Sequence, residues 1–270
     1  METVRQTLKK QIVGKKIKNV NVIYERMIES DLEEFKKKLV GLSFDDILRK
    51  GKWLLFSIGD YYLCSHLRME GKYFIKKNSD EINKHEHVIF TFDDGSDLRY
   101  HDTRKFGKML ILPNDLVNKY FIDKNLGLDA IDETINYKDL YKKWHPKKIA
   151  LKKMLLDQSF LAGIGNIYAD EICFSCALDP TSKVYDLSKK DFENIVFHTQ
   201  RILKGAIKSG GTTIRSYTSS LGVNGLFQLK LKVHNQKKCQ VCQTEIKKII
   251  CDGRGTYRCV KCQKVKRKRG

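Results

Sequence analysis

The 270-residue sequence lacks the features that place a chain in a membrane or mark it for secretion. It has no uninterrupted run of about 18 apolar residues, so no transmembrane helix is expected. Its first residues, Met1 to Arg5, contain no apolar signal core. Apart from a basic C-terminal stretch, it has no low-complexity segment and no internal repeat, so a repeat architecture is not expected.

Acidic residues are far fewer than basic residues. The chain has 52 Lys and Arg against 32 Asp and Glu, which gives a net charge of +20. An excess of this size implies a polyanionic partner, with nucleic acid as the first candidate and an anionic membrane surface as the second. Hydrophobic residues make up 41% of the chain, with 13 Phe, 12 Tyr and 2 Trp, which excludes a disordered chain. The length indicates two domains, or two and a small module.

Four of the eight cysteines follow the spacing C-x2-C-x16-C-x2-C near the C-terminus: Cys239, Cys242, Cys259 and Cys262. Two such pairs joined by a hairpin suit the four thiolate ligands of one structural Zn²⁺. The alternative is two disulfides or unrelated thiols. The other four cysteines are expected to be free thiols, which suits a reducing cytosol, and two of them are expected in buried helical positions: Cys64, Cys173, Cys176 and Cys251.

The predicted zinc hairpin and the end of the chain carry many basic side chains. On the hairpin these are Lys247, Lys248, Arg254 and Arg258, and behind it Lys264, Lys266, Arg267, Lys268 and Arg269. A small metal-held hairpin is a rigid mount, so we expect it to present these cations to the polyanion.

The first part of the chain favours strands. A helix is expected over Glu2–Gly14 and another over Asp31–Leu39. From Ser43 to about Leu112 short apolar runs alternate with tight turns, which predicts an antiparallel sandwich or barrel. Residues 1–113 therefore form the first predicted domain, and 114–146 a linker and entrance to the second.

Helices dominate from Lys147 onward. They are expected over 149–156 and 167–176, and a long helix is expected to start at Ser188, with Asp191 completing a capping pair. The predicted domains are a helical domain over 147–228, a zinc finger over 229–265 and a basic tail over 266–270. The fold class is α+β.

Several stretches are candidates for function. The Gly163-Ile-Gly-Asn166 turn precedes a helix whose free N–H groups favour an anion, although a plain packing corner is the alternative. In Asp102-Thr-Arg104-Lys-Phe106-Gly, a guanidinium next to an aromatic ring suits insertion into a base stack. The alternative there is an ordinary salt bridge and a core Phe.

Other candidates have stronger ordinary explanations. Lys52 precedes an apolar strand, and considered by itself it is expected to be a solvated lysine at the edge of that strand. Met69, considered by itself, is expected to be a core residue. His85 and His87 lie two apart in a predicted strand, where we expect phosphate contact in preference to a metal.

Taken in order, these stretches resemble formamidopyrimidine-DNA glycosylase, a bacterial base-excision repair family, over essentially the whole length. The matching stretches are Glu2-Thr-Val-Arg5, Gly51-Lys-Trp-Leu-Leu-Phe56, His66-Leu-Arg-Met-Glu-Gly71, Lys84-His-Glu-His87, Leu98-Arg-Tyr-His-Asp-Thr-Arg-Lys-Phe-Gly107, Gly163-Ile-Gly-Asn-Ile-Tyr-Ala-Asp-Glu171, Gly210-Gly-Thr-Thr213 and the four cysteines.

The resemblance implies an N-terminal antiparallel β-sandwich with flanking helices, and a C-terminal helix–two-turn–helix domain with a zinc-finger hairpin. It implies a monomeric cytoplasmic, nucleoid-associated bacterial enzyme that clamps double-stranded DNA across a basic cleft. This enzyme flips out an oxidised purine such as 8-oxoguanine or a formamidopyrimidine, removes it, and nicks the abasic site by β,δ-elimination.

The resemblance also assigns residues. Met69, Arg104 and Phe106 fill the vacated base stack, and Arg104 faces the orphaned cytosine. Asn166 and Arg254 grip phosphates. Further DNA-contact positions are His66, His85 and Lys147. Lys52 matches the proton donor in β-elimination and Arg254 the residue associated with δ-elimination. Residues 211–227 form a loop over the lesion base.

The sequence departs from the family at its start, where the family has Pro-Glu-Leu-Pro-Glu-Val before Glu-Thr-Val. The family's proline amine attacks the sugar C1′, and the adjacent glutamate handles protons. Met1 stands at the last of these positions, so we expect a true start upstream. The alternative is a catalytically impaired protein that binds lesions or abasic sites. Two smaller departures, Leu128-Asp-Ala130 for Pro-Glu-Pro and His234-Asn-Gln for Tyr-Gly-Arg, should shift local phosphate contacts.

Overall fold

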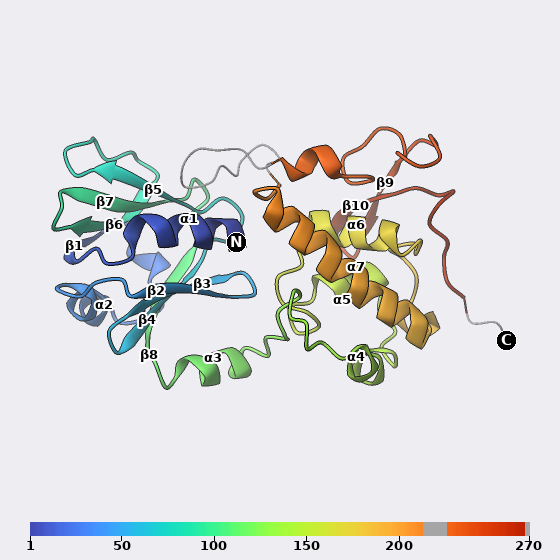
Figure 1. Ribbon diagram of the computed structural model, residues 1–270, viewed down its shortest axis with the longest axis horizontal. Helices are drawn as coiled ribbons and strands as arrows, with labels where there is room; N and C mark the ends of the chain where they lie inside the picture. The colour runs from blue at the N-terminus through green and yellow to red at the C-terminus, as the bar shows by residue number, and fades with distance from the viewer. Residues whose placement is uncertain (213–225, 268–270) are drawn as a thin grey trace. The chain divides into compact units, whose positions relative to one another are not determined.

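The computed structural model describes residues 1–212 and 226–267, which form two compact units (Figure 1). The first unit is built mainly from Met1–Lys124, and the second from Asn125–Ser209 and the chain from Leu226 onward. Within the described ranges no helix is both long enough and apolar enough to cross a membrane.

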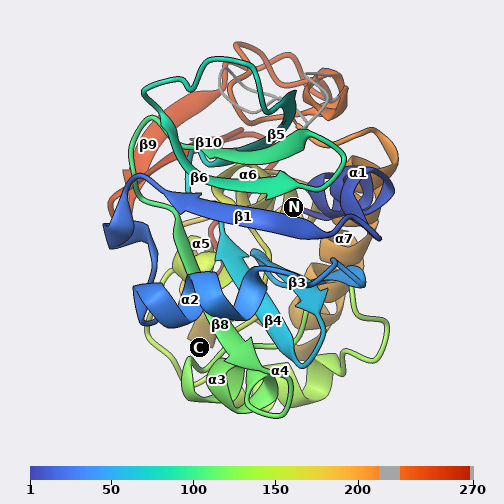
Figure 2. The same cartoon turned by 90° about the vertical axis from the view of Figure 1, so that its left-hand side faces the viewer.

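Two four-stranded antiparallel sheets form the first unit, and Figure 2 shows them one above the other. The first sheet has the order β1-β6-β7-β5, with β1 at Ile17–Val22, β5 at Lys72–Lys77, β6 at Glu86–Phe92 and β7 at Ser96–His101. The second has the order β2-β3-β4-β8, with β2 at Asp46–Lys50, β3 at Trp53–Ile58, β4 at Tyr61–His66 and β8 at Lys108–Pro113. The predicted antiparallel sandwich is confirmed.

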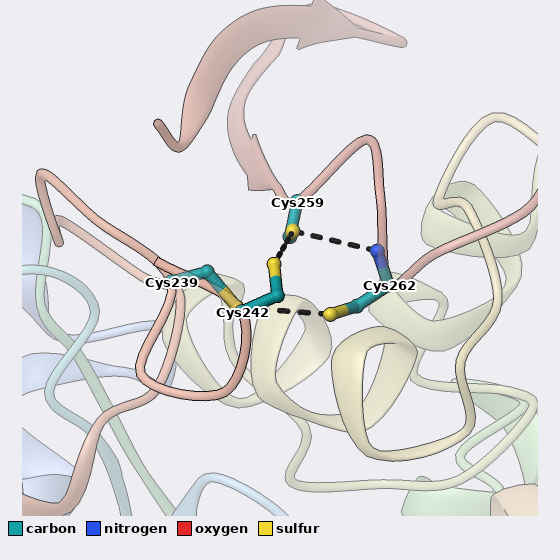
Figure 3. Close-up of side chains that lie close together, drawn as sticks. All are labelled: Cys239, Cys242, Cys259 and Cys262. Atoms are coloured by element: carbon teal, nitrogen blue, oxygen red, sulfur yellow. Dashed lines mark hydrogen bonds between the residues drawn. The ribbon is translucent and has the colours of Figure 1, made fainter. Parts of the chain in front are cut away.

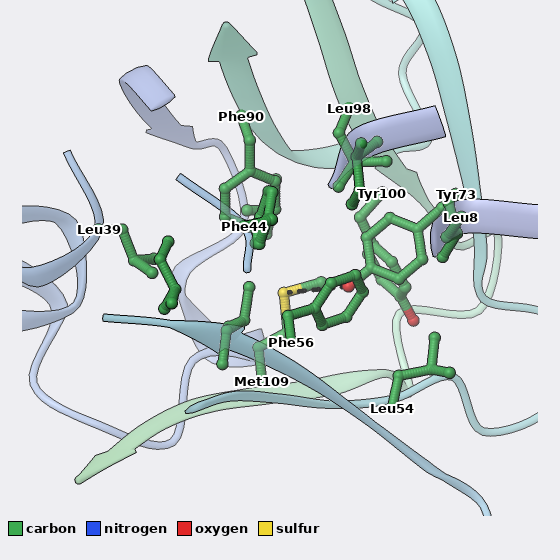
Figure 4. Packing of buried hydrophobic residues seen from close by; sticks show 14 of the residues in the cluster. Leu8, Leu39, Phe44, Leu54, Phe56, Tyr73, Phe90, Leu98, Tyr100 and Met109 are labelled. Atoms are coloured by element: carbon green, nitrogen blue, oxygen red, sulfur yellow. Dashed lines mark hydrogen bonds between the residues drawn. The ribbon is translucent and has the colours of Figure 1, made fainter. Parts of the chain in front are cut away.

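Aromatic rings from both sheets meet in the core of this sandwich (Figure 4). The ring of Phe44 lies 5.5 Å from that of Phe56 on β3 and 6.3 Å from that of Phe90 on β6. Tyr73 on β5 approaches Phe56 at 5.5 Å. The two sheets thus pack face to face, with aromatic side chains from both filling the space between them.

Four helical segments flank the sheets: α1 at Glu2–Ile12, the 3₁₀ turn η1 at Glu25–Met27, α2 at Leu32–Leu39 and α3 at Val117–Asp123. Helix α1 ends two residues earlier than expected, because Val13 is already extended and Gly14 has φ +83°. Helix α3 lies in the stretch that the sequence assigned to a linker. The ring of Phe121 in α3 packs 5.8 Å from that of Trp53, and residues 114–124 belong to the first unit. The rest of the stretch, from Asn125 onward, belongs to the second unit.

The second unit is helical. Its helices are α4 at Tyr137–Trp144, α5 at Leu151–Leu156, α6 at Asn166–Ser175 and α7 at Lys189–Lys208, with 3₁₀ turns η2 at Val184–Asp186 and η3 at Phe227–Lys230. Two successive turns join α5 to α6, which confirms the helix–two-turn–helix arrangement. The capping box predicted at Ser188 and Asp191 is present at the start of α7. Strands β9 at Lys247–Cys251 and β10 at Arg254–Arg258 pair as the expected hairpin.

Candidate functional site

Three exposed side chains from two separate loops of the first unit touch one another. The guanidinium of Arg104 lies 4.7 Å from the ring centroid of Phe106, and its Nη1 is 3.2 Å from the sulfur of Met69. Met69 is 58% exposed and Phe106 48%. These three residues, the insertion cluster, are thus brought together as the resemblance implied, and the simpler interpretation of Met69 and Phe106 as core residues is wrong.

The buried carboxylate of Asp102 shapes the loop that carries two of these side chains. Its Oδ1 accepts the backbone N–H of Arg104 at 3.0 Å, and its Oδ2 accepts those of Phe106 and Gly107 at 2.9 and 2.8 Å. Lys105 between them adopts φ +57°, a left-handed conformation that such local bonds stabilise. This role of Asp102 was not predicted from the sequence, although Asp side chains commonly accept backbone N–H groups in turns.

Two glycines allow the loops of the insertion cluster to approach the sandwich. Gly71 ends the Met69 loop and Gly107 ends the Arg104 loop. A Cβ atom at either position would overlap the hydroxyl group of Tyr100. The buried Tyr100 side chain therefore forms a shared support under both loops, and only glycine fits against it.

Lys52 lies in the turn between β2 and β3, close enough to the start of α1 for its charge to act on the amino group of Met1. Glu2, the first residue of α1, accepts hydrogen bonds from Arg5 at 2.7 Å and from Arg49 at 3.0 Å. Burial opposes ionisation of Glu2, but these two guanidinium groups hold its pKa below the usual value. At Met1, burial and then the charge of Arg49 lower the pKa of the α-amino group to about 6. The surroundings at the start of α1 therefore favour an uncharged amine at neutral pH.

His66 at the end of β4 is held as a neutral imidazole. Its ring packs 4.9 Å from the ring of Trp53, and burial, followed by the charges of Arg68 and Lys52, lowers its pKa to about 4. Because its Nδ1 accepts the backbone N–H of Arg68 at 3.0 Å, the ring proton resides on Nε2. His66 can thus offer a neutral N–H donor and no charge at neutral pH.

The structure separates the two histidines that the sequence treated as a pair. His85 lies in the turn before β6 and is half-exposed, so it does not share a strand face with His87 as predicted. His87 is buried, and its Nε2 lies 2.8 Å from the carbonyl oxygen of Asp102. Of the two, only His85 has a side chain that is accessible to a ligand.

In the second unit, Asn166 and Arg254 come close although they are far apart in sequence. The side-chain amide of Asn166 donates to the carbonyl of Gly255, next to Arg254, at 3.0 Å. Arg254 is exposed at the start of β10. The residue that begins α6 and the strand that carries Arg254 are therefore tied together, and both a helix start and a guanidinium are groups that favour a phosphate.

A buried ionic network, not anticipated from the sequence, fixes the hairpin to α6. Asp170 binds the ammonium of the fully buried Lys152, the Nδ1 of His234 at 2.6 Å and the backbone N–H of Tyr257 at 3.3 Å. The adjacent Glu171 accepts the backbone N–H groups of residues 232–234, each at 2.9 Å. His234, where the sequence departs from the family, thus contacts protein and not solvent.

The four predicted cysteine ligands converge in the second unit (Figure 3). All four sulfur atoms lie within 4.8 Å of one another, with Cys239 and Cys262 at 3.8 Å and Cys242 and Cys259 at 3.4 Å. A tetrahedral zinc with Zn–S bonds of about 2.3 Å would set them roughly 3.8 Å apart. The Val241 N–H also points at the Cys239 sulfur at 3.4 Å, as groups around a bound thiolate do. The donor set fits one structural Zn²⁺, as predicted.

Two predicted DNA-contacting features remain, the side chain of Lys147 and the loop over 211–227. Lys147 is exposed, with its ammonium 3.8 Å from the ring centroid of the buried Trp144. The predicted loop over 211–227 lies mostly in residues 213–225, outside the described ranges.

Comparison with known proteins gives one family for both units. Residues 1–109 match the family model of the formamidopyrimidine-DNA glycosylase N-terminal domain, and residues 126–218 that of the formamidopyrimidine-DNA glycosylase H2TH domain. The chain is 42% identical over 270 residues to formamidopyrimidine-DNA glycosylase of Oceanobacillus iheyensis, covering 97% of this chain and 95% of that one. It is 41% identical over 266 residues to that of Streptococcus mutans, covering 98% and 97%.

Two solved structures show the same similarity. One is a mutant FPG of Lactococcus lactis in complex with Fapy-dG-containing DNA, with a TM-score of 0.93, 38% identity and 97% of each chain covered. Another is the Lactococcus lactis Fpg with DNA containing an abasic site, with a TM-score of 0.92, 38% identity and the same coverage.

Proposed function

The chain belongs to the formamidopyrimidine-DNA glycosylase family, and we propose that it is a base-excision repair DNA glycosylase. It removes oxidised purines from double-stranded DNA and nicks the abasic site that results. A relative with this name supports this function, and so do structural neighbours solved with DNA that carries a Fapy-dG lesion or an abasic site. It acts on the nucleoid in the bacterial cytoplasm.

The insertion cluster is the observation that carries this proposal. Met69 and Phe106 expose apolar surface, although the core of the first unit is well filled. Arg104 lies between them with its guanidinium held against the Phe106 ring. When a damaged nucleotide leaves the duplex, the two apolar side chains occupy the gap in the stack, and Arg104 donates hydrogen bonds to the orphaned base.

Cationic groups of each unit hold the bent duplex by its phosphates. Asn166, at the start of α6, and Arg254 bind the phosphates beside the flipped nucleotide, and Lys147 and His85 bind others. The zinc ion supplies no chemistry, because its four protein ligands leave no open position. It holds the hairpin that carries Arg254.

Base removal requires an amine to attack C1′ of the damaged nucleoside, so that the glycosidic bond breaks and the base departs. The Schiff base that remains loses a C2′ proton, and the 3′-phosphate leaves in β-elimination. Lys52 donates a proton during the β-elimination, and Arg254 assists the δ-elimination that follows.

Borohydride reduction on an abasic duplex tests the activity. The protein with Pro-Glu-Leu-Pro-Glu-Val placed before Met1 is expected to become covalently bound to the DNA. The same protein with alanine for the leading proline serves as the control. If the extended protein binds the duplex yet is never trapped, the protein is a lesion-binding protein and not a lyase. Release of 8-oxoguanine from one duplex in competition with an oxidised-pyrimidine duplex tests the substrate class.

A further inference from the structure

A completely buried arginine lies in the β1-β6-β7-β5 sheet of the first unit. Arg99 on β7 has 0% of its surface exposed, yet it carries a full positive charge. All five of its N–H groups are used: Nε donates to Asp97 at 3.0 Å, and Nη1 donates to Glu86 and to the Glu81 carbonyl, both at 3.0 Å. Nη2 donates to the carbonyls of Lys77 and Asp80 at 3.0 and 2.8 Å. An arginine side chain has five N–H donors, so every donor of Arg99 has an acceptor.

The three carbonyl acceptors all belong to one segment, residues 77–85, which runs from the last residue of β5 to the residue before β6. The carboxylate acceptor Glu86, at the start of β6, also reaches into this segment by accepting the Asn83 N–H at 3.1 Å. Its other oxygen pairs with the Lys76 ammonium at 2.6 Å. The Arg99 guanidinium therefore bonds to the beginning, middle and end of the segment at the same time.

Hydrophobic packing cannot order this segment. Residues 77–84 are all exposed, and even Ile82 leaves 51% of its surface in water. The conformational entropy of an exposed segment opposes a fixed shape at roughly 1–2 kcal/mol per residue, so hydrogen bonds must hold it. The charge-assisted bonds from Arg99 are the strongest that reach it. An arginine that served only the sheet would need its two carboxylate partners and no carbonyls.

The segment ends in Lys84, which is exposed, and His85, which is half-exposed. We propose that Arg99 is a positioning residue that holds the 77–85 segment in the shape in which Lys84 and His85 bind a DNA phosphate. This inference rests on the proposed function, because it takes DNA as the ligand. Arg99 itself does not touch the DNA.

Amide hydrogen exchange tests the ordering without DNA and without any substitution. In the wild-type protein, the amides of Asp80, Asn83 and Glu86 should be protected, although the segment is exposed. Arg99→Lys keeps the charge but cannot reach three carbonyls, and it should speed exchange across 77–86 only. Lys15→Met removes an ion pair at the turn between β6 and β7 and leaves the segment alone, so it should change nothing there. Unprotected wild-type amides would overturn the proposal.

A double-variant cycle tests the link to binding. Arg99→Lys and Lys84→Ala/His85→Ala should each weaken binding to an abasic duplex roughly tenfold. The combined variant should bind no more weakly than Lys84→Ala/His85→Ala, because both remove the same contact. Losses that multiply would show that Arg99 acts elsewhere. If the wild type does not distinguish abasic from intact duplex, the proposed function fails, while the exchange experiment still decides whether Arg99 orders the segment.

Discussion

The side-chain amide of Asn166 donates to the backbone carbonyl of Gly255 at 3.0 Å, which ties the first residue of α6 to the strand that carries Arg254. This bond spans 89 residues of sequence. It joins the two groups assigned to phosphate binding in the second unit, so they are expected to act as one site.

Asn166→Asp should therefore weaken DNA binding more than removal of a single contact. The carboxylate cannot donate to the Gly255 carbonyl, and its charge repels a phosphate. We expect a loss of about 2 kcal/mol in binding free energy, measured by titration with an abasic duplex. Asn114→Asp is the matched control, since Asn114 makes the same type of bond to the Gly59 carbonyl in the first unit. Equal effects of the two substitutions would contradict the assignment.

Asp102→Asn should disorder the insertion cluster. An asparagine offers one acceptor oxygen where the carboxylate accepts three backbone N–H groups, so at least one buried donor loses its partner. Stability of the first unit should fall by about 1–3 kcal/mol, measured by urea unfolding, and the preference for abasic over intact duplex should decrease. Asp94→Asn, in an exposed turn, is the control and should leave that preference unchanged.

Removal of zinc should release the hairpin and leave the sandwich intact. Without the metal, the four cysteines are no longer joined to one centre, and β9 and β10 lose the support that positions Arg254. Treatment with a chelator should increase proteolysis within 237–262 and reduce DNA binding, while thermal unfolding of the first unit stays unchanged. Retention of full DNA affinity by the metal-free protein would contradict the role of the hairpin.

The neutral His66 predicts a dependence of stability on pH. Its pKa is lowered from 6.5 to about 4 in the folded protein, so between these values the unfolded chain binds a proton that the folded chain does not. Stability contributed by this group is therefore present above pH 6.5 and decreases as the pH falls towards 4, by about 3 kcal/mol. His66→Gln should reduce the slope of unfolding free energy against pH in this window. Identical slopes would show that the imidazole is not held neutral.

Lys147→Ala should affect the salt dependence of binding and not its specificity. Lys147 is exposed and lies against the Trp144 ring, so it offers one charge to the duplex. The slope of log K against log salt should flatten by about 0.9, the share of a single phosphate contact. The relative affinity for lesion and intact duplexes should stay the same. An unchanged slope would remove Lys147 from the interface.

The local part of the fold could be predicted from the sequence. The capping box at Ser188 and the zinc ligands depend on residues at fixed short spacing, and short-range geometry is encoded directly. The hairpin at Gly59 also follows from turn chemistry that sequence displays. Errors in these elements were confined to one or two residues at their ends, where helices commonly fray.

The buried polar groups could not be predicted. Arg99, Asp102 and the pair Lys152 and Asp170 look like ordinary surface charges in the sequence, because each bonds partners distant along the chain or backbone groups that composition does not show. His85 and His87 likewise seemed equivalent until the start of β6 placed them in different environments. Burial is a property of packing and has no local signature.

The order of motifs in the sequence determined that this protein binds a metal through four thiolates, carries a helix–two-turn–helix domain and belongs with enzymes that act on DNA. Only the tertiary structure decided which charges face solvent and which hold loops in place. The reason is physical: spacing along the chain fixes contacts between neighbours, whereas the pairing of a buried charge depends on which distant segments the core brings to it.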